Sequence, residues 1–361
     1  MLNAFSRRRG SVAVALAAAA VLAACSTPAP EPTPVPPPAP VAAPPPALAL
    51  NQGIAEAASV YVSFIRDVGT IRAGFPDAES IQAAIRKGAA YEPAQLSRGM
   101  IAYGAVLALQ SPEFVQGVRT YAADPAQRQD MVARITADPA YAATMPGAEA
   151  AAGLITSTIG QDIAALTSIA VSVEDDAYKI QERQDPRRRW AVVHIANRDV
   201  RLQNAKSLSA ARMLPSADES AKLFAAANSG AGLGLTAGKA GPPYTPAVAR
   251  SLAIAALAAL GAGGEDARAS TEALTVESSS EFCLNMSKLN LFQCLAASRP
   301  SYEDMFCVGR HIVRDLATCT AQGMQPRVPA TAASLNASAP AQSPAAEAAA
   351  AAGAAVQAAT R

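Results

Sequence analysis

The chain has 361 residues, of which 51% are hydrophobic but only 5% aromatic, and its 30 basic residues balance 29 acidic ones. This length excludes a disulfide-stapled mini-protein, and a net charge of +1 excludes nucleic acid as an expected partner. Because much of the apolar content is alanine and aromatic residues are scarce, the composition favours helices.

The first 25 residues have the three-part layout of a secretory signal. Arg7, Arg8 and Arg9 form a positively charged segment, residues 12–24 are uninterruptedly apolar, and small residues precede Cys25. This apolar stretch is too short to span a bilayer, which needs about 20 residues in a helix. We therefore predict a signal peptide over residues 1–24, with a short buried helix as the alternative.

The sequence Leu22-Ala23-Ala24-Cys25 is similar to a lipobox, so residues 1–25 resemble a bacterial lipoprotein precursor. The resemblance implies cleavage before Cys25 and attachment of diacylglyceryl to its sulfur. Since Ser26 rather than Asp follows the cysteine, it also implies an outer-membrane location with the protein facing the periplasm. We expect export by the general secretory route, with a twin-arginine route as the alternative.

Low-complexity sequence lies on both sides of the central part of the chain. Eleven prolines between residues 26 and 46 predict a semi-rigid polyproline tether over residues 25–50. At about 3.1 Å per residue this tether could reach roughly 65 Å, and a PxxP ligand is the alternative. Residues 326–361 are mostly Ala, Pro and Ser, and we expect them to form a disordered tail.

Apolar residues between these segments repeat at the three- and four-residue spacing of amphipathic helices. The repeat runs through residues 54–75, 96–107 and 159–180, and it predicts a helical domain over 51–228. Short helices are expected after the Ser-Pro or Asp-Pro pairs that begin at residues 111, 124 and 138, because such pairs combine an N-cap with proline at the first helical position.

A second long helix is expected after Asp185-Pro186, running to about Met213 and folding back on the first, with a kinked continuation as the alternative. Residues 229–246 are rich in Gly and Pro and predict a loop, and residues 247–325 return to helical spacing. No run of alternating β-branched residues stands out. The expected fold is therefore all-α, a multi-helix bundle with long antiparallel helices.

Four cysteines at the C-terminal end of this region predict a cross-linked helical hairpin. Cys283, Cys294, Cys307 and Cys319 are too far apart within one helix for a disulfide, since 11 residues of helix rise about 17 Å. Antiparallel helices would place Cys283 beside Cys319 and Cys294 beside Cys307, with residues 301–304 as a possible capping box. The layout loosely resembles a coiled-coil-helix-coiled-coil-helix hairpin, and zinc binding is the alternative.

Few residues suggest catalysis. His194 and His311 are the only histidines, which excludes multi-histidine metal sites, and no GxSxG or HExxH motif is present. The GxGxxA pattern at residues 232–237 follows a helical segment where a dinucleotide-binding fold needs a strand. We therefore predict no catalytic residue, no metal and no cofactor.

One basic cluster suggests an interaction surface beside Trp190. Its central members are Arg187, Arg188 and Arg189, and its others are Arg183, Arg198 and Arg201. Guanidinium groups there could bind phosphate or carboxylate groups of lipid headgroups, lipopolysaccharide or cell-wall polymer. The alternative is a solvated helix end.

These features together predict a lipid-anchored scaffold or interaction protein of the cell envelope. Its expected partners are the membrane, through the lipid on Cys25, and cell-wall polymer or other envelope proteins. The alternative is a helical envelope enzyme or carrier, such as a cell-wall lyase using one acidic residue or a bundle that opens a groove for lipid.

Overall fold

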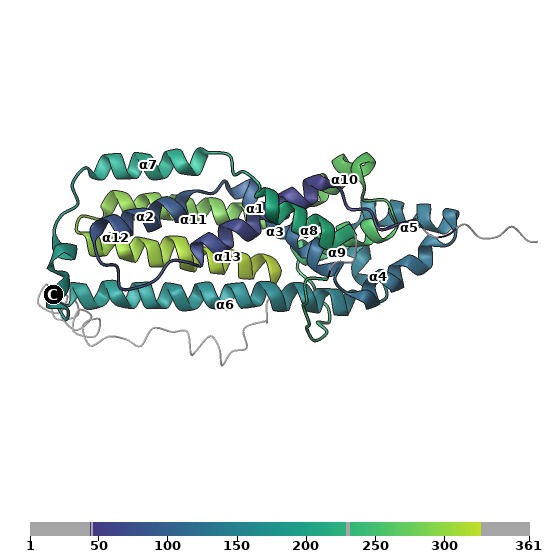
Figure 1. Cartoon of the computed structure of the whole chain (residues 1–361), viewed down its shortest axis with the longest axis horizontal. Helices are drawn as coiled ribbons and strands as arrows, with labels where there is room; N and C mark the ends of the chain where they lie inside the picture. The colour runs from purple at the N-terminus through teal and green to yellow at the C-terminus, as the bar shows by residue number, and fades with distance from the viewer. Residues whose placement is uncertain (1–43, 45, 229–231, 326–361) are drawn as a thin grey trace, which may run out of the picture. The chain divides into compact units, whose positions relative to one another are not determined.

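The computed structural model describes residues 44, 46–228 and 232–325, and within them the regular structure is helical, which confirms the all-α fold (Figure 1). The expectations for Cys25, the signal peptide, most of the tether and the C-terminal tail lie outside these residues. The helices follow in the order α1 (Gln52–Val68), α2 (Ala78–Ala89), α3 (Pro93–Ala108), α4 (Pro112–Arg119), η1 (Thr120–Ala122), α5 (Pro125–Ala137), η2 (Pro139–Thr144), α6 (Ala148–Gln181), η3 (Pro186–Val192), α7 (Arg198–Ala210), α8 (Ala217–Asn228), α9 (Pro246–Ala259), η4 (Glu265–Ala267), α10 (Arg268–Leu274), α11 (Ser278–Ala297), α12 (Ser301–Cys307), η5 (Val308–Arg314) and α13 (Asp315–Met324).

Several helices begin with the same local device, a polar N-cap followed by proline. The cap side chain accepts a hydrogen bond from a first-turn N–H, and proline supplies a fixed φ without needing its own N–H partner. This device starts α3, α4, α5, η2, η3 and α9. The three short helices predicted after residues 111, 124 and 138 are therefore confirmed.

The long helix α6 packs against the C-terminal helices α12, η5 and α13 (Figure 1). Gly309 permits this approach, because a Cβ there would lie 2.9 Å from Glu174 Cγ. Arg314 also binds Glu174 through both carboxylate oxygens, at 2.6 and 2.8 Å. Among the described helices, α6 alone has the length and apolar composition to cross a membrane, a test that a core helix also passes.

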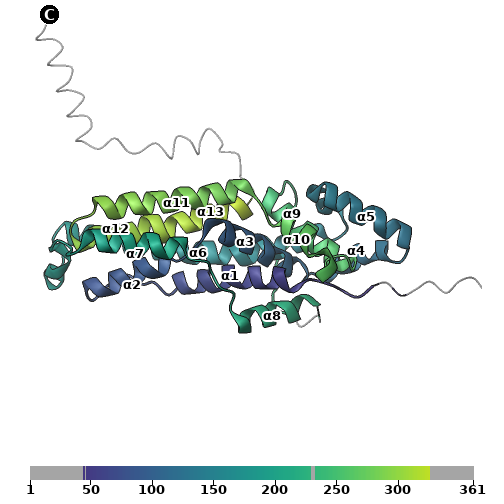
Figure 2. The same cartoon turned by 90° about the horizontal axis from the view of Figure 1, so that it is seen from above.

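The C-terminal hairpin consists of α11 packed against α13, as the view from above shows (Figure 2). Cys283 and Cys319 form one disulfide, with their Cα atoms 5.6 Å apart, and Cys294 and Cys307 form the other, at 5.8 Å. The stapled hairpin is thus confirmed, and both pairs are the ones that antiparallel helices predict.

The helix α9 is the centre of a second group of helices and contacts α3, α4, α5 and η2. Gly104 allows the close approach of α3 and α9, since a Cβ there would lie 2.4 Å from Ser251 Oγ. The end of the predicted tether also belongs to this group. Ala49 N donates to Ala258 O at 3.1 Å, and Arg119 Nη1 donates to Pro46 O at 2.8 Å, so the packed body begins before residue 51.

The predicted long helix from residue 186 to about 213 is wrong. The structure instead has the short 3-10 helix η3, an extended connector and the separate helix α7. The connector pairs with the turn between α11 and α12, where Ile195 N donates to Arg299 O at 2.8 Å and Ser301 N donates to Val193 O at 3.3 Å. Asn197 then takes a left-handed φ of 55°, which breaks any continuous helix.

Two smaller expectations are also corrected. The apolar repeat predicted one helix through residue 75, but α1 ends at Val68. Gly74 has a φ of 82° in the connection that follows, and Phe75 is buried without being part of a helix. The capping box over residues 301–304 does not form. Asp304 is instead buried and accepts a hydrogen bond from Ser298 Oγ at 2.6 Å.

Candidate anion-binding cleft

The predicted basic cluster separates into arginines that hold the fold together and arginines that face solvent. Arg198, on α7, belongs to the first group. Its Nε donates to Ser298 O at 2.7 Å, and its Nη2 donates to Ala296 O at 2.6 Å. These carbonyls lie at the C-terminal end of α11, where a cation compensates carbonyl groups that have no partner within the helix.

Arg201, one turn further along α7, is buried against Asp304 of α12. Its guanidinium also donates to Ser298 Oγ at 3.2 Å and to the carbonyl of Leu295. Gln82 Nε2 donates to the second oxygen of Asp304 at 2.9 Å. The Arg201 charge is therefore neutralised inside the protein and cannot contact an external anion.

Arg188 is held between two carboxylates. It forms ion pairs with Asp176 of α6 at 2.6 Å and with Asp185 at 2.9 Å. Burial raises the pKa of Asp176, but hydrogen bonds from Arg188 and from the Gly74 N–H outweigh it, so the net pKa is below its ordinary value. Arg188 therefore fixes the connection after α6.

The remaining members, Arg183, Arg187 and Arg189, are exposed and have no ion pair or hydrogen bond from their side chains within the described residues. Arg183 and Arg189 line a cleft of about 510 Å³ at the end of α6, together with Arg188. Arg187 does not line this cleft. The structure thus divides the three adjacent arginines, with Arg188 inside the fold and Arg189 at the cleft.

An aromatic hollow of about 200 Å³ adjoins this cleft, and Gln181 and Tyr302 line both. Its other aromatic residues are Tyr178 of α6 and Phe306 of α12, whose ring centroids are 5.8 Å apart in an edge arrangement. Tyr178 is 48% exposed. We call the two together the arginine-aromatic cleft.

The chemistry of this cleft fits an anionic ligand that also has flat or apolar surface. Guanidinium groups bind carboxylate or phosphate oxygens in a forked geometry, and exposed aromatic rings pack against apolar faces. Sequence reasoning found the arginines but missed the aromatic rings. No local signal could have found them, because Tyr178 and Tyr302 come together only through the packing of α12 on α6.

Asp162, on α6, has a raised pKa because burial opposes its charge, although Arg66 lowers it. This acid lines none of the principal hollows of the described part. No group of three or more His, Cys, Asp and Glu side chains among the described residues is placed to hold a metal ion.

The chain matches no protein-family model and is similar to no curated protein and no solved structure.

Proposed function

We propose that this protein is a lipid-anchored scaffold of the bacterial cell envelope that acts by binding. In this proposal the lipid on Cys25 holds the chain at the outer membrane, and the proline-rich segment extends the helical body into the periplasm. The anchor rests on the lipobox-like sequence before Cys25 and on the apolar segment that precedes it.

The observation that carries the binding role is the arginine-aromatic cleft. Arg183 and Arg189 are free of acidic partners in the described part of the chain, whereas Arg188, Arg198 and Arg201 are all engaged within the fold. Free guanidinium groups beside the exposed Tyr178 ring and the half-buried Tyr302 and Phe306 rings favour an anionic polymer of the envelope as the partner.

The competing enzyme hypothesis needs an acid of raised pKa in a cleft. Asp162 has the raised pKa but lies outside the principal hollows. Asp185, which does line the cleft, has a lowered pKa because it accepts hydrogen bonds from Arg187 N and the Arg188 side chain. A binding role therefore requires fewer assumptions.

The test compares the double variant Arg183→Gln/Arg189→Gln with Arg128→Gln/Arg310→Gln, which removes the same charge outside the cleft, from the half-buried Arg128 and the exposed Arg310. Each full-length protein is mixed with insoluble cell-wall polymer and sedimented at low and moderate salt. We expect the cleft variant to bind at least about tenfold more weakly, since two charge-assisted contacts are lost, and the control to bind like wild type.

Equal loss in both variants would show that only net charge matters and would contradict the cleft assignment. Turnover of cell-wall fragments by the purified protein, abolished by a single Asp→Asn or Glu→Gln substitution, would replace the scaffold proposal with the lyase alternative.

A further inference from the structure

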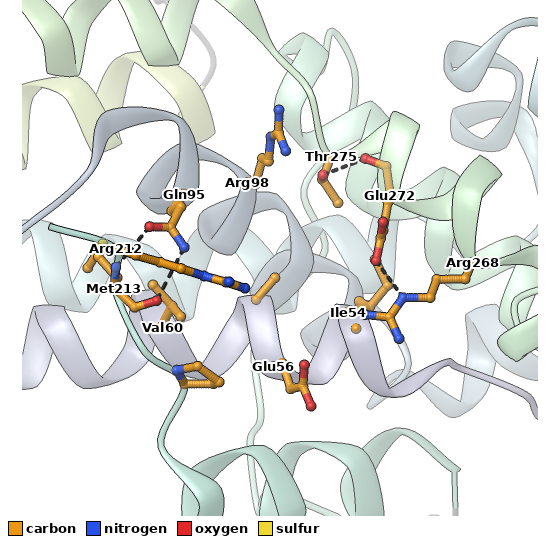
Figure 3. A pocket seen from close by; sticks show the side chains of 13 residues that line it. Ile54, Glu56, Val60, Gln95, Arg98, Arg212, Met213, Arg268, Glu272 and Thr275 are labelled. Atoms are coloured by element: carbon orange, nitrogen blue, oxygen red, sulfur yellow. Dashed lines mark hydrogen bonds and ion pairs between the residues drawn. The ribbon is translucent and has the colours of Figure 1, made fainter. Parts of the chain in front are cut away.

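Another hollow lies where α1, α3, α10 and the connection between α7 and α8 meet. It has a volume of about 230 Å³. In Figure 3, Arg212 extends from the left, Arg98 lies at the top, and the ion pair of Arg268 with Glu272 lies on the right. Ala57 of α1 and Met213 and Pro215 of the connection contribute an accessible apolar lining.

The position of Arg212 is set by Gln95 of α3. The Gln95 amide makes two hydrogen bonds to the backbone of Met213, accepting from its N–H at 2.9 Å and donating to its carbonyl at 3.2 Å (Figure 3). Because Arg98 lies three residues after Gln95, both side chains share one face of α3. These two hydrogen bonds therefore hold the segment that carries Arg212 against the face of α3 that carries Gln95 and Arg98.

Two acids, Glu56 and Glu272, line the hollow, and Glu272 is paired with a different arginine. Arg268 Nε donates to Glu272 at 2.7 Å, and the charges of Glu272, Glu265 and Glu56 raise the Arg268 pKa. Arg98 and Arg212 have no ion pair or side-chain hydrogen bond among the described residues. Arg98 and Arg212 thus line one hollow, and neither has an acidic partner among the described residues.

We infer that this hollow binds a small organic oxyanion, a carboxylate or a phosphate monoester, whose compact apolar body contacts the apolar lining of Ala57, Met213 and Pro215. Arg98 and Arg212 bind the oxyanion, and Gln95 is a positioning residue. Like charges held at one site repel each other, and a bound oxyanion converts that repulsion into charge-assisted hydrogen bonds. This inference is independent of the arginine-aromatic cleft, which lies at η3 and α12.

The test uses isothermal titration of the purified full-length protein with benzoate, phenyl phosphate and neutral benzamide. We expect one of the two anions to bind with a Kd of about 0.1–1 mM, the range for a few charge-assisted contacts, and benzamide to bind at least about tenfold more weakly. Tighter binding of benzoate identifies carboxylates as the ligand class, and tighter binding of phenyl phosphate identifies phosphate monoesters.

Arg98→Gln/Arg212→Gln should weaken anion binding at least about tenfold, while the charge-matched Arg128→Gln/Arg310→Gln variant keeps the wild-type Kd. Gln95→Ala should weaken it less, because both charges remain but the connection that carries Arg212 is released. The inference is overturned if no probe binds below about 10 mM, if benzamide binds as tightly as the anions, or if the Arg98/Arg212 variant binds like the control.

Discussion

The sequence placed Arg201 in a surface cluster of arginines, but the structure buries it in an ion pair with Asp304. Both side chains are buried, and Asp304 also accepts from Ser298 and Gln82. The Arg201 Nε has no partner among the described residues, so desolvation of the pair is incompletely offset. Replacing one member of such a pair lowers the free energy of unfolding more than replacing both members, because a single replacement leaves an unpaired buried charge.

We predict that Arg201→Met lowers the free energy of unfolding by about 3–5 kcal/mol, because Asp304 keeps its buried charge without a cation. The double variant Arg201→Met/Asp304→Asn should lose less than the sum of the single variants. Urea unfolding of all three measures the coupling. Strict additivity would mean that the two side chains do not interact in solution.

Lys288, on α11, is a second buried charge and predicts a pH dependence. Its Nζ donates to Ser209 O at 2.6 Å and lies 4.6 Å from the centroid of the Tyr91 ring. Burial lowers its pKa from 10.5 to about 8, although Glu92 opposes the shift. Between these two values the unfolded chain binds the proton and the folded chain does not, so stability rises with pH.

We therefore expect the free energy of unfolding to rise from pH 8 to about 10 in wild type, and Lys288→Met to abolish that rise. Above about pH 10 the trend reverses, because burial raises the pKa of Tyr61, Tyr91 and Tyr103 and the unfolded chain ionises first. Urea unfolding at intervals from pH 7 to 10 checks the slopes. The same slope in wild type and variant would rule Lys288 out as the titrating group.

At the scale of elements, the hairpin of α11 with α12, η5 and α13 depends on its two disulfides. The Cys283–Cys319 bridge spans 36 residues and the Cys294–Cys307 bridge spans 13. A longer closed loop restricts the unfolded chain more, so the outer bridge is expected to contribute more stability.

We predict that Cys283→Ala/Cys319→Ala costs about 4 kcal/mol of unfolding free energy and that Cys294→Ala/Cys307→Ala costs about 3 kcal/mol. Urea unfolding under non-reducing conditions measures both, and reduction of wild type gives the reference without either bridge. A larger loss from the inner pair would show that packing around the buried Cys307, rather than chain entropy, sets the balance.

Local sequence predicted the helix starts after residues 111, 124 and 138 because capping depends on residues only two or three positions apart. It failed after Asp185 for a non-local reason. The connector before α7 pairs with the turn at residues 299–301, about a hundred positions later in the chain. The spacing of apolar residues in residues 186–213 therefore could not predict that part of this segment would pair with another part of the chain instead of forming a helix.

At the scale of the whole molecule, the described helices share one apolar core that runs from Ile54 and Leu96 to Leu257 and Leu316. The residues before this body carry the expected membrane anchor. The proposed role therefore depends on two separable parts, a lipid on Cys25 and the surfaces of the helical body.

We predict that wild-type protein fractionates with membranes and that Cys25→Ser releases it, because the diacylglyceryl group can no longer be attached. The helical unfolding transition of the variant should be unchanged. Mass spectrometry of the N-terminal peptide checks the modification directly, and a wild-type Cys25 without lipid would contradict the anchor.

The sequence by itself determined the helical class and the helix starts after residues 111, 124 and 138, because capping and apolar spacing are local properties. It also predicted the cysteine pairing, because helix rise excludes bridges within one helix and an antiparallel hairpin leaves these two pairs. Only the tertiary structure decided which arginines remain free. Arg201 meets Asp304 across 103 positions of sequence, and Arg188 meets Asp176 across 12, whereas Arg98 and Arg212 meet no acid among the described residues. A charge is neutralised only when packing brings an opposite charge within a few ångströms of it, and the neighbouring residues in sequence do not show whether this happens.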